Sequence, residues 1–180
     1  MYIHSVLTVA ALYLCMLVFP ASSNAKEADW FQLGVRSGVG ETGNGFEMKQ
    51  YEMYGLYRLP WGHRFSSSTA LATRLDGTIG GLEHQQQTGA IATLSPTIAL
   101  DLAHDRISLN GGVGAALLSQ RRFGKINFGG NFQFRLHAGA DVNVTRRISA
   151  GYRFQHMSNA NTFETNPGLN LHMAELAYRF

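Results

Sequence analysis

The chain has 180 residues, a formal net charge of +3 and 45% hydrophobic residues. This length corresponds to one domain, and a single cysteine excludes an intramolecular disulfide. No run of 18 or more apolar residues follows the first 25 residues, so no transmembrane helix is predicted there. The few positive charges are mostly scattered, and no nucleic-acid partner is expected.

The first 25 residues are typical of a secretory signal peptide. An apolar centre at residues 6–19 is followed by small residues that end at Ala25, the pattern that a signal peptidase reads. We therefore expect residues 1–25 to be removed and residues 26–180 to form the mature domain. His4 stands where such peptides usually carry Lys or Arg, which leaves an uncleaved membrane anchor as the alternative.

The rest of the chain alternates with period two between apolar or small residues and polar residues, a pattern that indicates β-strands. Residues 131–144 are the clearest example, with apolar side chains at every even position. The segments with this pattern cover roughly 30–40, 47–58, 66–80, 90–102, 107–117, 131–144, 148–158 and 170–180. The sequence therefore predicts an all-β fold of eight strands.

The connections between these segments alternate in length. Short connections are predicted at 59–63, 103–106 and 145–147, and longer ones at 41–45, 80–87, 120–130 and 159–169. Short turns at one end and longer loops at the other are typical of an up-and-down outer-membrane barrel, with the turns in the periplasm. We predict an eight-stranded antiparallel transmembrane β-barrel in the outer membrane of a Gram-negative bacterium.

Charged residues fall on the polar parity, which in such a barrel faces the interior. They are Arg36, Arg58, Arg74, Arg135, Arg153 and Arg179 with Glu52, Asp76, Asp101, Asp141 and Glu175. We expect them to pair with one another rather than to catalyse a reaction. Because the side chains of an eight-stranded barrel fill its interior, no open channel is expected.

The chain ends in "LAYRF", with the aromatic Phe180 as its last residue. This ending resembles the assembly signal of Gram-negative outer-membrane barrels. A soluble β-sandwich or a lipocalin-like barrel is the alternative, and it would place the apolar parity inside. The aromatic end and the alternating connection lengths favour the membrane barrel.

The apolar parity of segment 148–158 continues into His156 and Ser158. Neighbours on one face of a strand are about 6.6 Å apart at Cα. In the predicted topology both residues face lipid at the external rim, with Asn170 of the last segment close to them. There they would meet lipopolysaccharide, with its ester-linked acyl chains. A serine and a histidine are the minimal nucleophile and base, although polar residues are also ordinary at a membrane boundary.

The string His-x-Ser-Asn-Ala followed by Asn-Pro-Gly, within residues 156–170, resembles the PagL family of lipid A 3-O-deacylases. These are eight-stranded outer-membrane barrels that hydrolyse the ester at position 3 of lipid A. The resemblance implies that His156 is the general base and Ser158 the nucleophile. It also implies that Asn159 supports the site and Asn166 helps to hold the oxyanion. No cofactor is implied.

The sequence departs from this family at one position. The resemblance places the third catalytic residue, an acid, twelve residues after the serine, where this chain has Asn170. An asparagine orients a histidine through its carbonyl but does not stabilise imidazolium by charge. Glu164, in the loop, is an alternative acid. Glu175 is a poorer one, because its parity is inward and it lies about 16 Å farther along the strand.

Three basic residues, Arg121, Arg122 and Lys125, cluster in the third long connection. They are candidates for contact with the phosphates of lipid A, and a solvated basic loop is the alternative. The sequence has no Cys/His grouping with zinc spacing and no glycine-rich phosphate loop, so no metal site is predicted.

Three functions are compatible with these observations. The first is an outer-membrane esterase that removes the 3-position acyl chain of lipid A. The second is a non-catalytic structural or adhesive barrel with a degraded site. The third, a lipid A acyltransferase barrel, would need interior room for an acyl chain that eight filled strands do not obviously leave. The sequence does not identify any protein partner.

Overall fold

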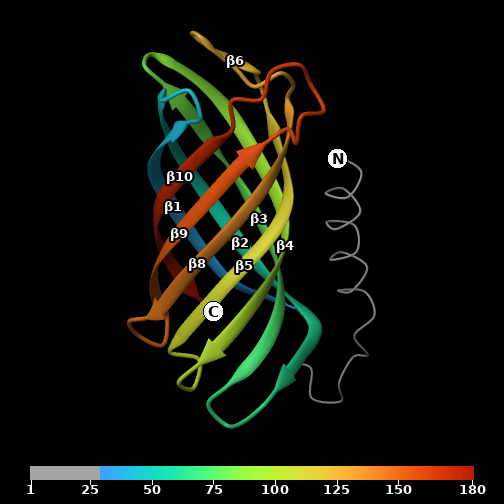
Figure 1. Ribbon diagram of the computed structural model, residues 1–180. Helices are drawn as coiled ribbons and strands as arrows, with labels where there is room; N and C mark the ends of the chain where they lie inside the picture. Colours follow the sequence, from blue (N-terminus) through green and yellow to red (C-terminus); the bar gives the residue numbers. More distant parts are fainter. Residues whose placement is uncertain (1–28) are drawn as a thin grey trace.

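The computed structural model describes residues 29–180, and the predicted signal peptide lies outside the described residues. Eight long antiparallel strands close into a barrel in the order β1-β10-β9-β8-β5-β4-β3-β2 (Figure 1), which confirms the predicted fold class. The strands are β1 (Trp30–Thr42), β2 (Glu47–Arg64), β3 (Ala70–His84), β4 (Gln87–Leu102), β5 (Ile107–Leu118), β8 (Phe132–Asn143), β9 (Ile148–Ser158) and β10 (Leu169–Arg179). Within residues 29–180 no helix is long and apolar enough to cross a membrane.

The connections at one end of the barrel are four or five residues long, whereas those at the other end range from two to thirteen residues. The connections 65–69, 103–106 and 144–147 lie at the end that carries Phe180. The connections 43–46, 85–86, 119–131 and 159–168 lie at the other end, which we call the loop end. β9 therefore runs toward the loop end and finishes there at Ser158.

Two predicted connections are wrong. The segment 80–87 belongs mostly to β3 and β4, which stay paired as far as His84 and Gln87. Only two residues form the turn, and Gln85 takes a positive φ of 54° there. The segment 59–63 lies inside β2, where the register with β3 shifts between Arg58 and Gly62. A proline at an interruption of the ladder costs no pairing hydrogen bond, so the "LPWGH" stretch does not end the strand.

Most of the charges predicted to face the interior pair with one another there, whereas Arg58 contacts Asp29 and Asp141 accepts a hydrogen bond from Asn110. The guanidinium of Arg36 contacts Glu52 at 3.0 Å and Asp76 at 2.7 Å. Arg153 contacts Asp76 at 3.0 Å and Glu175 at 2.6 Å. Since each buried charge has an opposite charge beside it, the network offsets much of the cost of removing these groups from water.

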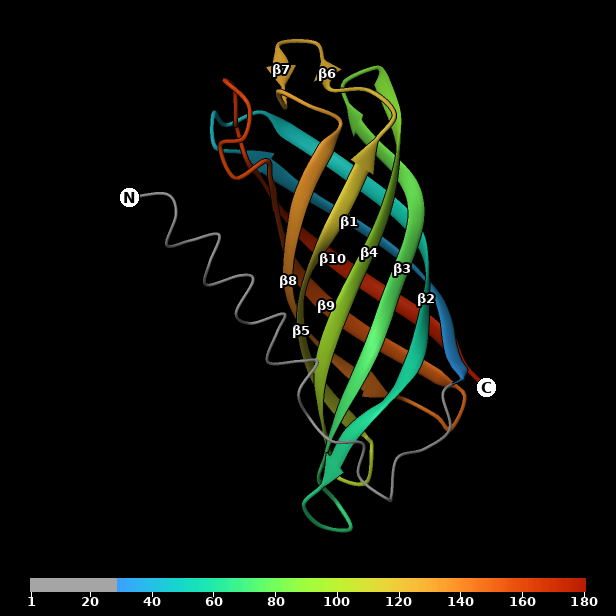
Figure 2. The same cartoon turned by 90° about the vertical axis from the view of Figure 1, so that its right-hand side faces the viewer.

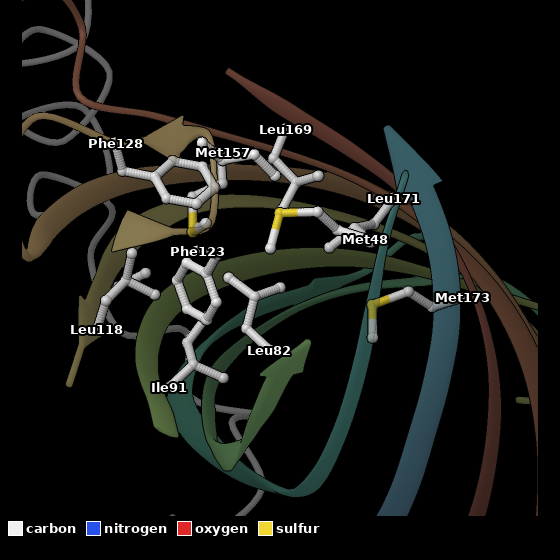
Figure 3. Packing of buried hydrophobic residues seen from close by; sticks show 12 residues of the cluster. Met48, Leu82, Ile91, Leu118, Phe123, Phe128, Met157, Leu169, Leu171 and Met173 are labelled. Carbon is white, nitrogen blue, oxygen red and sulfur yellow. The ribbon is translucent and has the colours of Figure 1, made fainter. Parts of the chain in front are cut away.

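An apolar cluster fills the interior at the loop end (Figure 3). It combines strand residues such as Leu82 and Met157 with Phe123, Ile126 and Phe128 from the connection 119–131. This connection contains a small hairpin, β6 (Arg122–Phe123) and β7 (Ile126–Asn127), which stands beyond the barrel strands in Figure 2. Burial of these apolar side chains holds the hairpin across the barrel end, so the loop end has a fixed shape.

Candidate active site

His156 and Ser158 lie on the outward face of β9. The residues between and before them, Gln155 and Met157, are both 0% exposed and point into the barrel. On the same parity as His156, Tyr152 is 51% exposed. Because successive side chains of a strand point to opposite faces, His156 and Ser158 project from the outer wall, and both are partly exposed.

Asn170 is the partner of His156 across the β9–β10 ladder. Its Oδ1 lies 2.8 Å from Nδ1 of the imidazole. An amide oxygen carries no hydrogen, so Nδ1–H is the donor and Nε2 of the neutral ring keeps its lone pair. The contact therefore fixes the tautomer that leaves Nε2 free to accept a proton.

Ser158 is the last residue of β9 and pairs with Phe134 of β8. It lies two residues from His156 on the same face, a Cα separation of about 6.6 Å. Within residues 29–180 no hydrogen bond joins the Ser158 hydroxyl to the imidazole. In enzymes without substrate, hydrogen bonds between catalytic side chains are often long or poorly aligned, so the missing bond does not exclude the pair.

Gly168 lies beside the imidazole at the end of the loop 159–168. Its φ is +62°, and a Cβ at this position would lie 3.5 Å from Cε1 of His156. Glycine adopts this left-handed conformation at little steric cost. The residue therefore lets the loop turn into β10 right against the histidine.

Asn159 points into the barrel and ties two loops together. Its side chain is buried, and Nδ2 donates to the carbonyls of Phe128 at 2.8 Å and of Thr165 at 2.7 Å. Its backbone N–H donates to Oδ1 of Asn166 at 3.2 Å. Asn166 in turn donates from Nδ2 to Oδ1 of Asn161 at 2.9 Å. These bonds hold the loop 159–168 over the site.

The remaining predicted residues are also at the loop end but are not brought to the imidazole. Glu164 is exposed in the loop, and the bond to Nδ1 of His156 comes from Asn170. Arg121, Arg122 and Lys125 are exposed around the small hairpin. Arg121 makes one long bond, 3.5 Å, to the carbonyl of Gly129.

A second polar pair on the outer wall was not singled out from the sequence. The hydroxyl of Tyr152 lies 2.6 Å from Nδ1 of His172, and the ring of Phe154 lies 5.3 Å from the ring of His172. Shared parity of β9 and β10 is the signal that could have found this pair. The bond gives the hydroxyl and Nδ1 a partner where the surrounding wall is apolar.

The described residues contain no group of three or more His, Cys, Asp or Glu side chains placed to hold a metal ion. Around the outward end of β9, the groups available for chemistry are an imidazole with a free nitrogen, a hydroxyl and an amide, those of His156, Ser158 and Asn170. This set fits transfer of an acyl group from an ester, in which a base activates a hydroxyl nucleophile.

Comparison with known proteins gives one family. The model of the family described as lipid A 3-O-deacylase (PagL) matches residues 49–179, a range that contains His156, Ser158 and Asn170. Over 76 residues the chain is 34% identical to the lipid A deacylase PagL of Bordetella bronchiseptica, strain ATCC BAA-588 / NCTC 13252 / RB50. This alignment covers 42% of the chain and 43% of that relative, so it spans less than half the length of either protein.

The crystal structure of the outer membrane enzyme PagL has a similar fold. It superimposes with a TM-score of 0.67 over 80% of this chain and 97% of that one, at 23% identity. At this identity the match supports the barrel architecture alone.

Proposed function

The chain belongs to the lipid A 3-O-deacylase (PagL) family, and we propose that it is an outer-membrane esterase that hydrolyses the 3-position acyl ester of lipid A. The observation that carries the proposal is the bond from Nδ1 of His156 to Oδ1 of Asn170. It leaves Nε2 free as a base on the same outward face as Ser158. Membership of the family supplies the substrate class.

In the first step His156 Nε2 takes the proton from the hydroxyl of Ser158 as Oγ attacks the ester carbonyl. A bond forms between Oγ and the carbonyl carbon, and the bond from that carbon to the sugar oxygen breaks. The proton on Nε2 then passes to the sugar oxygen, which leaves as a hydroxyl. Asn170 holds the ring through Nδ1–H throughout.

In the second step water attacks the acyl-serine. His156 takes a proton from the water and returns it to Oγ, which releases the hydroxy fatty acid and restores Ser158. Both steps pass through a negatively charged oxygen, and the resemblance assigns Asn166 to it. Asn166 Nδ2 carries two hydrogens, one bonded to Asn161, so the other is available to the oxyanion. Loss of one such donor typically costs about a hundred- to a thousand-fold in rate.

We place this site at the outer leaflet of the outer membrane, where lipopolysaccharide lies. The short connections of outer-membrane barrels face the periplasm, and β9 runs away from that end toward Ser158. In this orientation the outward face of β9 meets the acyl chains of lipid A. Arg121, Arg122 and Lys125 lie at the same end and are proposed to contact its phosphates.

A non-catalytic barrel is the competing function, and Asn170 is the residue that favours it. In serine proteases an Asp-to-Asn change in the triad costs about 10⁴-fold. The esterase proposal therefore needs direct measurement of lipid A.

The test is mass spectrometry of lipid A from Gram-negative cells that express the chain. We expect the wild type to remove one hydroxyacyl mass and Ser158→Ala to leave lipid A intact. Ser37→Ala is the matched control, because Ser37 is an exposed serine on β1 outside the site, and it should behave as the wild type does. Identical lipid A with the wild type and Ser158→Ala would overturn the esterase and favour the structural barrel.

The orientation is tested with single cysteines in a Cys15→Ser background. Gln86→Cys lies in the turn at the loop end, and Ser67→Cys lies in a connection at the opposite end; both positions are exposed. A membrane-impermeant maleimide added to intact cells should label the first variant and not the second until the cells are opened. The reverse labelling would place the site at the inner leaflet.

A further inference from the structure

Asn170 has a second cross-strand neighbour, which only the closure of the barrel reveals. β10 pairs with β9 on one side, where Asn170 is opposite His156, and with β1 on the other, where Asn170 is opposite Glu41. All three side chains are outward, because Val39 on the parity of Glu41 is 54% exposed while Thr42 is buried. His156, Asn170 and Glu41 therefore form one row across three strands.

The backbones of β1 and β10 come close together at this row. A Cβ added at Gly40 would clash with the backbone carbonyl of Asn170, and one added at Gly38 would clash with the carbonyl of His172. Glycine at these two positions permits the approach. Side chains directly opposite across an antiparallel pair have Cβ atoms about 4.5–5.5 Å apart, so the Glu41 carboxylate is within reach of the Asn170 amide.

The oxygen and the nitrogen of the Asn170 amide differ in their hydrogen bonding. Oδ1 accepts the bond from His156, whereas Nδ2, with two hydrogens, has no hydrogen-bond partner within residues 29–180. A carboxylate is an acceptor at every lone pair and would bind this donor. A bond from Nδ2 to an anion pulls electron density toward Oδ1, since hydrogen bonds in a chain polarise one another.

We propose that Glu41 is a positioning residue of the esterase, which acts through Asn170 in place of the family's acid. Its carboxylate accepts from Nδ2 of Asn170, and the polarised Oδ1 holds the His156 ring and stabilises it when Nε2 gains a proton. The row supplies a negative charge about two strand spacings, roughly 10 Å, from the imidazole. No bond of the reaction changes, and the inference rests on the proposed function.

The other charged residues near Glu41 are Glu47 and Lys49, and neither lies opposite Asn170. Glu47 is opposite Glu41 on β2 and lies one strand farther from Asn170. Lys49 is opposite Val39, diagonal to Glu41, and no ion pair joins Lys49 to Glu41 within the described part of the chain. Two glutamates directly opposite each other disfavour the folded barrel slightly, so Glu41 is not explained by cross-strand pairing with β2.

The test measures release of hydroxy fatty acid from lipid A in detergent micelles by the purified chain. We expect Glu41→Gln to lower kcat about tenfold, because Nδ2 of Asn170 loses its anionic acceptor and Oδ1 then stabilises the imidazolium less. KM should stay unchanged, because Glu41 does not touch the substrate. Glu47→Gln is the matched control: it removes the same charge from the adjacent strand and should leave kcat as in the wild type.

The same substitution in an Asn170→Asp variant separates a positioning role of Glu41 from a structural one. In Asn170→Asp the acid lies next to His156, so adding Glu41→Gln should not lower kcat further. An equal loss in both backgrounds, an equal loss with Glu47→Gln, or no loss in the wild-type background would overturn the proposal.

Failure of the esterase itself gives a different result. If neither the wild type nor Asn170→Asp releases fatty acid, the proposed function is wrong and the role of Glu41 falls with it. If the wild type is inactive and Asn170→Asp is active, the site is an esterase site but Glu41 does not replace the acid.

Discussion

The barrel has two polar regions, the interior and the outer wall, and their polar groups have different partners. In the interior, Arg36 is fully buried and contacts three carboxylates, those of Glu52, Asp76 and Glu175. On the outer wall, His156 bonds to the neutral Asn170 and keeps one ring nitrogen free. The interior charges are buried and paired with opposite charges, whereas the outer group keeps an acceptor on a partly exposed face. An accessible acceptor, rather than charge density, distinguishes the candidate site.

The largest effect is expected from breaking the interior network. Arg36→Met leaves three carboxylates without their shared cation, and removal of one partner of a buried ion pair costs about 3–5 kcal/mol. We expect this loss in the free energy of unfolding, measured by urea titration in detergent micelles. Arg58→Met is the control, because its partner Asp29 is half exposed and such surface pairs contribute about 0–1 kcal/mol. Equal losses would remove the distinction between the two kinds of pair.

A smaller effect, on rate alone, is expected at the outer wall. Asn170→Asp keeps the shape of the side chain that bonds to His156 and adds a charge that stabilises imidazolium. We expect kcat for fatty acid release to rise about tenfold or more, a change of about 1.4 kcal/mol. Asn44→Asp adds the same charge in the exposed connection 43–46 and should leave kcat unchanged. No gain with Asn170→Asp would mean that the asparagine suffices or that Glu164 is the acid.

The smallest effect on kcat is expected in the loop 159–168, which ends beside the histidine. Gly168→Ala places a side chain in a left-handed conformation, which costs about 1–2 kcal/mol. Gly45→Ala meets the same strain at a φ of +77° with nothing within 4 Å of its Cβ. We expect similar losses of stability in both variants and a severalfold fall in kcat only in Gly168→Ala, whose Cβ contacts His156. A fall in both would point to a general effect of loop strain.

Much of the fold could be predicted because alternation with period two is a local property. It located the eight long strands and assigned Arg36 and Asp76 to the interior. It missed the small hairpin at Arg122–Asn127, whose residues Phe123 and Ile126 are buried by tertiary packing rather than by any strand period. It also overestimated the connection 80–87, because polar residues continue the β3–β4 ladder beyond the apolar pattern.

In the candidate site, too, some features follow from the local sequence pattern and others only from tertiary contacts. Parity in the sequence predicted that His156 and Ser158 share a face, and the pairing of the last two segments across the 159–169 connection predicted that Asn170 is near them. Asn159, by contrast, turned out to brace the loops through Phe128 and Thr165. These contacts depend on how two connections fold over the barrel end, which no local pattern encodes.

By itself the sequence determined the strand alternation, the faces on which the histidine and serine lie, and the residue that stands in place of the family's acid. Only the tertiary structure decided which residue flanks Asn170 on its other side. Glu41 and Asn170 are far apart in the chain, and their pairing follows from the register at which the first and last strands close the barrel. Register across a closure is set by the whole ring of strands, so it is absent from any single segment.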